Sequence, residues 1–139
     1  MRTSARTMAL AAVAAAIVAC GSPTAAGGAA VPSGAWGGQH ITLAVTGSGA
    51  TVQFDCAHGS IGEPMTVDAN GHCAVAGTFV RQRGGPTRSD GSETPEAARY
   101  SGTLKGDTLT VTVELVDSQE TVGVFTLTRG GSGKLTKCL

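Results

Sequence analysis

The sequence predicts an all-β fold, a small antiparallel up-and-down β-barrel of about eight strands, with a β-sandwich as the alternative. In residues 108–115, apolar residues alternate with threonine and glutamate, and this period of two indicates a strand with one face in a core. Residues 100–129 as a whole predict three consecutive strands joined by tight turns at Gly106-Asp107 and at residues 117–120. Turn signals recur about every twelve residues and no helical period follows residue 19, which favours sequential hairpins that close into a barrel.

The first nineteen residues differ from the rest of the chain and predict an export signal. Arg2 and Arg6 form a basic start, and residues 8–18 are an apolar run too short for a permanent membrane helix. The run ends in Ile17-Val18-Ala19-Cys20-Gly21, which resembles the lipobox of bacterial lipoproteins. This resemblance implies cleavage before Cys20 and acylation of its thiol, and two or three acyl chains anchor a protein stably where one does not. The expected protein is exported and lipid-anchored to a bacterial membrane, on its periplasmic or extracellular face.

The segment after Cys20 contains only small residues and prolines, which predicts a flexible tether with nothing to bury. We therefore expect a lipoprotein signal peptide at residues 1–19, the lipidated cysteine and its tether at residues 20–33, and a single β-barrel domain at residues 34–139.

Within the domain, order is expected to begin at Gly34-Ala35-Trp36, and strands follow from short alternating runs between turns. Residues 57–62 are predicted to be irregular, and Asn70-Gly71 is a strong hairpin signal. Residues 84–98 form one long connection without periodicity, either functional or flexible. Val, Leu and Thr dominate the expected inward faces, which favours an interior filled by side chains. The strands are expected at residues 41–45, 51–56, 65–68 and from His72 to about Arg83, then three within residues 100–129, and a last one near residues 134–139.

Besides Cys20, the chain has Cys56, Cys73 and Cys138. An exported domain lies in a compartment that permits disulfides, and three thiols allow one bridge and one free cysteine. A bridge from Cys56 to Cys138 is preferred because it would pin the C-terminal strand, and a bridge from Cys56 to Cys73 stays open as the alternative. Cys73 alternates with Val75 and Phe79 on an apolar face, where a small buried thiol packs well.

Five short motifs together resemble a family of short exported bacterial β proteins of unknown function. The resemblance implies that Cys56 pairs with Cys138, because cysteine stands at both motif positions, while Cys73 departs from the family pattern. Gly34-Ala35-Trp36 is also similar to the Gly-x-Trp start of lipocalins. The family motifs are Trp36-Gly37-Gly38-x-His40, Phe54-x-Cys56-Ala57-His58-Gly59, Arg83-Gly84-Gly85-Pro86, Thr126-Leu127-Thr128-Arg129-Gly130 and the terminal Lys137-Cys138-Leu139.

Two groups of residues are candidate sites. Cys56-x-His58, His72-Cys73 and His40 supply donor types that suit zinc or copper, but His72 and Cys73 point to opposite faces of one strand, so we expect neither a metal site nor another cofactor. Arg81 and the loop that follows it could form a rim for anions, although acidic residues nearby (Asp90, Glu93 and Glu96) can neutralise it. The candidate binding loop comprises Arg83, Gly84, Gly85, Pro86 and Arg88.

Several function classes are excluded by composition and motifs. Aromatic residues make up 4% of the chain and no basic stripe is present, which excludes nucleic-acid binding. The chain has no nucleophile elbow, zinc-protease motif or phosphate loop, and Asp55, His58 and Ser60 lie too close in sequence to predict a catalytic triad. We therefore expect no enzyme.

The function expected from the sequence is a membrane-tethered lipoprotein with a non-enzymatic β-barrel binding or interaction module of the cell envelope. Such a module can recognise an envelope protein or a small ligand, and residues 84–98 could serve as the inserting element of a hydrolase inhibitor. The alternatives are a small-molecule carrier with a lipocalin-like interior, and an envelope metal or redox protein that uses Cys73 and the histidines.

Overall fold

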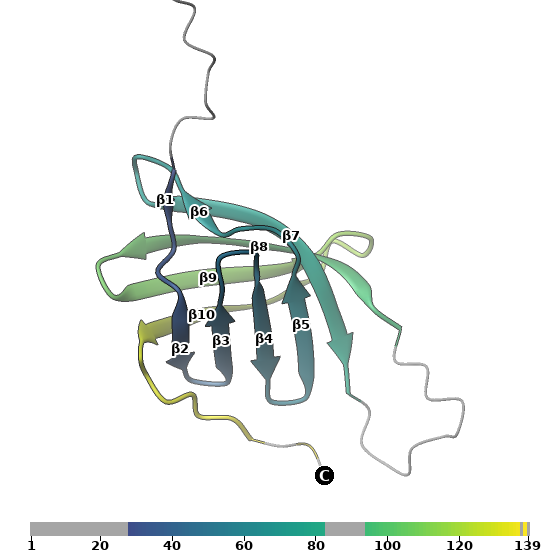
Figure 1. The fold of residues 1–139 in the computed structure, drawn as a ribbon. Helices are drawn as coiled ribbons and strands as arrows, with labels where there is room; N and C mark the ends of the chain where they lie inside the picture. Colours follow the sequence, from purple (N-terminus) through teal and green to yellow (C-terminus); the bar gives the residue numbers. More distant parts are fainter. Residues whose placement is uncertain (1–27, 83–93, 137, 139) are drawn as a thin grey trace, which may run out of the picture.

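The computed structural model describes residues 28–82, 94–136 and 138. It is a closed antiparallel barrel, as the sequence predicts, rather than a sandwich (Figure 1). Neighbours around the barrel follow the order β10-β2-β3-β4-β5-β7-β8-β9, and the pairing of β10 with β2 closes the ring. The eight strands are β2 (Gly34–Gly38), β3 (Ile41–Val45), β4 (Ala50–Phe54), β5 (Ala57–Ile61), β7 (His72–Arg81), β8 (Glu96–Lys105), β9 (Thr108–Leu115) and β10 (Thr121–Arg129).

The predicted number of barrel strands is correct. Two of the predicted strands, those at residues 65–68 and 134–139, are not barrel strands in the described part of the chain, and β2 and β5 take their places. β2 and β5 are strands where the sequence predicted only the start of order and an irregular segment, because both are rich in glycine and small residues that carry no apolar period. The predicted strand at residues 65–68 is the two-residue β6 (Thr66–Val67), which pairs with β1 (Ala29–Ala30) outside the barrel. The described part of the predicted terminal strand has only an isolated parallel bridge between Lys134 and Gln39.

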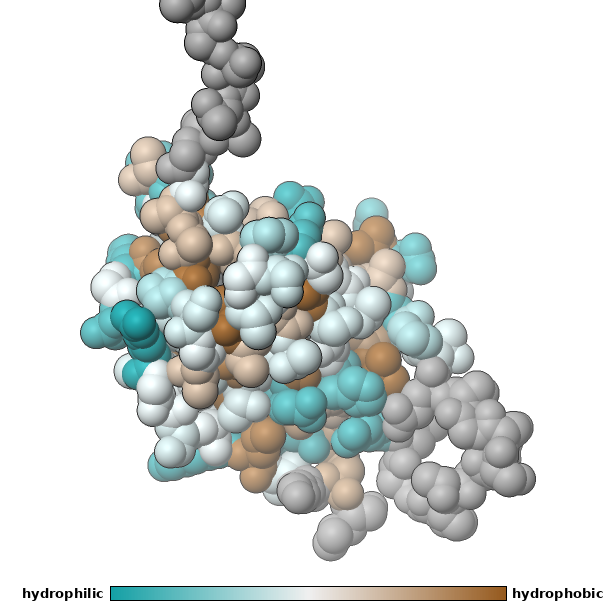
Figure 2. All heavy atoms as spheres, viewed as in Figure 1, coloured by the Kyte–Doolittle hydropathy of each residue, from teal (hydrophilic) through white to brown (hydrophobic). Residues whose placement is uncertain are grey.

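The core follows the period of two along each strand. In β9 the apolar residues are buried and the threonines between them face outward, so the prediction for this strand is confirmed. Cys73, Val75 and Phe79 are buried together on one face of β7, also as predicted. The side of the barrel seen in Figure 2 is dominated by residues of intermediate hydropathy, with strongly apolar residues scattered in small groups.

Tyr100 on β8 lies across two glycines in the barrel interior. A Cβ at Gly59 or Gly77 would collide with the tyrosine side chain, so the ring occupies space that only glycine leaves open. The phenolic hydroxyl donates a hydrogen bond to the carbonyl oxygen of Thr78 at 2.6 Å, and Tyr100 is 2% exposed. Burial raises the pKa of this hydroxyl to about 12.

At one end of the barrel, residues 28–33 lie against β6 and cover the core (Figure 1). Val31 is 2% exposed and packs in the core cluster with Met65 and Val67, and its backbone N–H donates to the carbonyl of Met65. The indole N–H of Trp36 donates to the carbonyl of Pro32 at 3.0 Å. The fold therefore begins before residue 34, and the end of the expected tether (residues 28–33) is part of the folded domain because Val31 packs in its core.

The turn predicted at Asn70-Gly71 is present between β6 and β7, and the backbone N–H of Asp68 donates to the carbonyl oxygen of His72 across it, but β6 pairs as a strand with β1 rather than with β7. Gly71 has a φ of 83°, and the Asp68 carboxylate accepts backbone N–H bonds from Asn70 and His72. These bonds, that of His72 first, lower the pKa of Asp68. The expected long connection ends earlier than residue 98, because β8 already begins at Glu96. Within the described ranges, no helical segment has the length and apolar character needed to cross a membrane.

Candidate functional site

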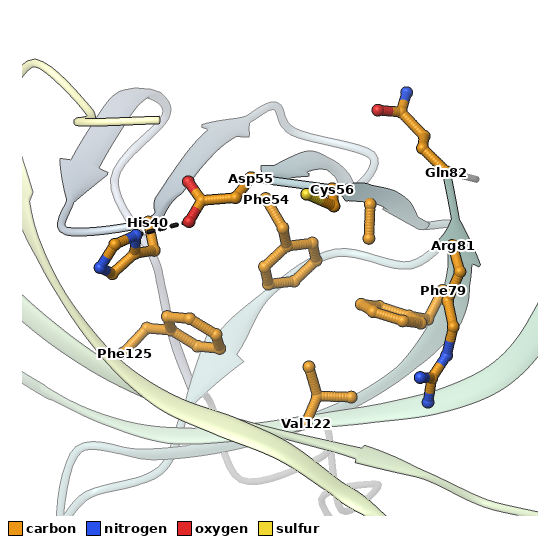
Figure 3. A pocket seen from close by; sticks show the side chains of 10 residues that line it. His40, Phe54, Asp55, Cys56, Phe79, Arg81, Gln82, Val122 and Phe125 are labelled. Carbon is orange, nitrogen blue, oxygen red and sulfur yellow. Dashed lines mark hydrogen bonds and ion pairs between the residues drawn. The ribbon is translucent and has the colours of Figure 1, made fainter. Parts of the chain in front are cut away.

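The open end of the barrel, opposite the N-terminal segment, contains a hollow of about 360 Å³. We call it the mouth. It lies where β4 and β7 end and where β5 and β10 begin, so its walls come from strands distant in sequence (Figure 3). Its lining residues are His40, Phe54, Asp55, Cys56, Ala57, Phe79, Arg81, Gln82, Val122 and Phe125.

The inner surface of the mouth is aromatic. The chain has three phenylalanines and all of them line this hollow, one each from β4, β7 and β10. The ring of Phe54 lies 5.3 Å from that of Phe79 and 5.4 Å from that of Phe125, both at tilted or edge-on angles typical of favourable aromatic pairs. Phe54 and Phe79 are buried, whereas Phe125 is partly exposed. The three rings converge in Figure 3 and form an apolar surface that solvent can reach.

Val122 completes this surface because of an irregularity in β10. The pairing of β10 with β9 shifts register between Thr121 and Gly123, as at a β-bulge. Beyond the shift, Gly123 pairs with the inward-facing Val113 and Phe125 with the inward-facing Val111. The extra residue allows Val122 to line the mouth together with Phe125, although the two are separated by an odd number of positions.

One side of the rim is a polar cluster built on His40 and Asp55. His40 occupies the turn between β2 and β3 with a φ of 67°, a conformation uncommon for a residue with a side chain. Its Nδ1 lies 2.5 Å from the Oδ2 of Asp55, and the backbone N–H of Thr136 donates to the Oδ1 of Asp55 at 2.7 Å. The Asp55 carboxylate therefore has a partner on each oxygen.

The C-terminal strap, defined as Lys134, Thr136 and Cys138, is fastened to this side of the rim. Lys134 exchanges backbone hydrogen bonds with Gly38 and His40, at 3.0 and 2.9 Å. A disulfide joins Cys138 to Cys56, with the two Cα atoms 5.3 Å apart. This pairing agrees with the preferred prediction and leaves Cys73 free and buried.

The other side of the rim is formed by Arg81. Its Nη2 donates to a carboxylate oxygen of Glu120 at 2.9 Å, and its Nε lies 3.6 Å from a carboxylate oxygen of Glu96. The hydrogen bond to Glu120 raises the pKa of the guanidinium further above its usual range. The guanidinium also lies 5.8 Å from the centre of the Phe79 ring. Two carboxylates thus match the charge of Arg81.

The residues predicted as candidate sites are only partly brought together. Cys20 and the candidate binding loop (Arg83, Gly84, Gly85, Pro86 and Arg88) lie outside the described residues. In the described ranges, no group of three or more His, Cys, Asp or Glu residues is arranged to hold a metal ion. His72 is exposed beside Thr103 while Cys73 is buried, so these two donors do face opposite ways, as predicted.

The neighbouring residues Asp55, His58 and Ser60 do not assemble into a triad. Asp55 bonds to His40 instead, and the Ser60 hydroxyl bonds to that of Thr78 at 3.0 Å. The aromatic surface is not predicted from the sequence, because its three members are ordinary apolar positions in their own strands. Phe54 and Phe79 lie near the C-terminal ends of β4 and β7, whereas Phe125 is the central residue of β10, so no common position along the strands marks the three rings in the sequence.

Comparisons with protein-family models, with curated proteins and with solved structures give no match for this chain. The suggested family and its implications therefore stay predictions, and the function has to be inferred from the geometry of the mouth.

Proposed function

We propose that this protein is a lipid-anchored, non-enzymatic binding protein of the cell envelope whose small-molecule ligand occupies the mouth of the barrel. The observation that carries the proposal is the gathering of every phenylalanine of the chain around one solvent-accessible hollow. Its volume of about 360 Å³ falls at the small end of the range of ligand pockets, about 300–1,000 Å³. Apolar walls with a few polar groups at the rim are the usual composition of such pockets.

The packing of the barrel supports a ligand at the mouth over one deep inside a lipocalin-like interior. The largest side chains with almost no exposure include Trp36, Tyr100 and Leu127, which belong to one continuous core cluster. An eight-stranded barrel is just wide enough for side chains to fill. The filled interior leaves a shallow site that suits a compact ring system rather than a long chain.

The chemistry of the lining residues supports binding rather than catalysis. No hydroxyl-bearing side chain occurs among the described residues that line the mouth, and the sulfur of Cys56 is committed to a disulfide. His40 and Asp55 bond to each other, and no hydroxyl or thiol of a described residue is hydrogen-bonded to either of them. The Cys56–Cys138 disulfide also supports export, because disulfides persist in oxidising compartments outside the cytoplasm.

The proposal can be tested with N-phenyl-1-naphthylamine, an uncharged dye that fluoresces when it leaves water. We expect saturable binding of one dye per protein. Phe125→Ala should weaken it about tenfold, because one aromatic contact and its buried area contribute about 1.4 kcal/mol or more. Val124→Ala is the matched control, since Val124 precedes Phe125 on the same strand but is 64% exposed and does not line the mouth.

Thermal unfolding of both variants separates loss of the site from loss of the fold. The proposal fails when the wild-type protein shows no saturable fluorescence increase, or when the two alanine variants lose affinity equally while both stay folded.

A further inference from the structure

The charges around the mouth define the kind of ligand that it can accept. The lining residues and their ion-pair partners carry one permanent cation, Arg81, against three carboxylates, those of Asp55, Glu96 and Glu120. Among the described residues of this part of the rim, carboxylates therefore outnumber arginine beside an aromatic surface.

The charge of Arg81 is already matched by two carboxylates. A guanidinium binds a carboxylate, phosphate or sulfonate through its N–H donors, usually two at once. Here Nη2 donates to Glu120 and Nε faces Glu96, so an incoming anion would approach a guanidinium that two carboxylates already flank. The guanidinium also rests near the Phe79 ring, a contact that holds it against the wall of the mouth.

The opposite side of the rim offers an anion no better partner. Both oxygens of Asp55 already have partners, and the carboxylate would repel a second negative charge. The face of the Phe79 ring, which carries the negative part of the aromatic quadrupole, lies beside the Arg81 cation. The carboxylates on both sides of the rim therefore disfavour negative charge.

We infer that the ligand of the mouth is a compact apolar ring compound that is uncharged or carries an amine, and that the site rejects carboxylates, phosphates and sulfonates of the same shape. This inference rests on the proposed function and adds the charge class of the ligand. Glu120 acts as the selecting residue, because its hydrogen bond to Arg81 blocks the guanidinium that would otherwise bind an anion.

A pair of dyes with one ring framework tests the inference. N-phenyl-1-naphthylamine is uncharged, and 8-anilino-1-naphthalenesulfonate carries a sulfonate on the same framework. We expect the sulfonate to bind about tenfold more weakly at low salt, since an unmatched charge about 7 Å away in a partly exposed site has an effect of this size. Added salt should narrow the difference because it screens the repulsion.

The decisive variant is Glu120→Gln, which releases one partner of Arg81. Binding of the sulfonate should strengthen at least about threefold while binding of the uncharged dye stays the same. Glu114→Gln is the control, because it makes the same change of net charge on the outward face of β9, where Glu114 is exposed. Both substitutions are at exposed positions, so both variants are expected to fold.

The outcomes separate this inference from the proposed function. When the wild-type protein binds the sulfonate as tightly as the uncharged dye, or when Glu120→Gln and Glu114→Gln strengthen sulfonate binding equally, the charge inference is wrong and the ligand site still stands. When neither dye binds saturably, the proposed function is wrong as well.

Discussion

Ionisation of Tyr100 is expected to destabilise the barrel between about pH 10 and pH 12. The side chain is 2% exposed, its hydroxyl donates to the Thr78 carbonyl, and burial raises its pKa from 10.0 to about 12. Below pH 10 the hydroxyl is protonated in both states, so stability does not depend on it. Above pH 10 the unfolded chain releases the proton first, and the free energy of unfolding falls until the folded state also ionises near pH 12. A difference of about two pKa units corresponds to about 2.7 kcal/mol.

The measurement is direct because the chain has one tyrosine. The ultraviolet absorbance of tyrosinate should develop near pH 12 in the folded protein and near pH 10 in urea. Urea unfolding at several pH values above 9 gives the decline in stability. Tyr100→Phe should lose about 1 kcal/mol at neutral pH with the hydrogen bond, but should decline less as the pH rises.

Lysines and arginines titrate alike in the wild type and in this variant, so the difference between the two curves isolates the tyrosine. Tyrosinate absorbance that develops near pH 10 in the folded protein would refute the reasoning. So would a Tyr100→Phe variant that loses stability as steeply as the wild type.

Three further predictions follow from the same structure. Cys138→Ser should lower the free energy of unfolding by about 4.5 kcal/mol, which is the loop-closure entropy for the 82-residue separation from Cys56. Equal stability of the wild type and this variant in urea unfolding would show that the bridge does not form. Cys73 is buried and its thiol pKa is raised by burial, so an aromatic disulfide reagent should modify it in urea but not in the folded protein. Gly59→Ala should cost about 1–3 kcal/mol or more, because the added Cβ meets a backbone carbonyl and the tyrosine hydroxyl. Gly47→Ala, where nothing lies within 4 Å, should change stability by less than about 0.5 kcal/mol, and equal losses in the two glycine variants would contradict the steric argument.

The parts of the fold that the sequence predicts well are those in which every inward position is apolar. β3 and β9 alternate without interruption, and their bounds lie within the predicted segments. β5 fails this test because its central inward residue is Gly59, which pairs with Phe79 and leaves room for Tyr100. At this position the space of an inward side chain of β5 is filled by Tyr100 from β8, and the sequence of β5 alone contains no sign of this.

The predicted terminal strand fails for a different reason. Its apolar and polar residues alternate weakly. Instead of a strand ladder, isolated hydrogen bonds join Lys134 to Gly38 and His40, and Thr136 to Asp55. The prediction that the C-terminus is pinned by a disulfide to Cys56 succeeds without the strand.

The mouth could not be predicted because its parts are far apart along the chain. The rings of Phe54, Phe79 and Phe125 come together only in the closed barrel. Val122 lies beside them because of a register shift in β10 that cannot be predicted from the sequence. The pairing of Arg81 with Glu120 likewise joins β7 to the turn before β10, across 39 residues. The loop that the sequence favoured as a binding element starts two residues after this arginine.

With the lipid anchor proposed for Cys20, the chain would enter the barrel at the end that Val31 helps to close. A lipid on Cys20 would hold the barrel by the end that Val31 helps to close, and the ten residues of β7, tilted as in small barrels, would place the aromatic rings about 25 Å farther from the bilayer. Ligand exchange would then occur with the surrounding aqueous phase, and molecules dissolved in the lipid would have no direct route to the rings. With that anchor, the protein would bind compounds that diffuse through the aqueous phase around it rather than compounds dissolved in the membrane.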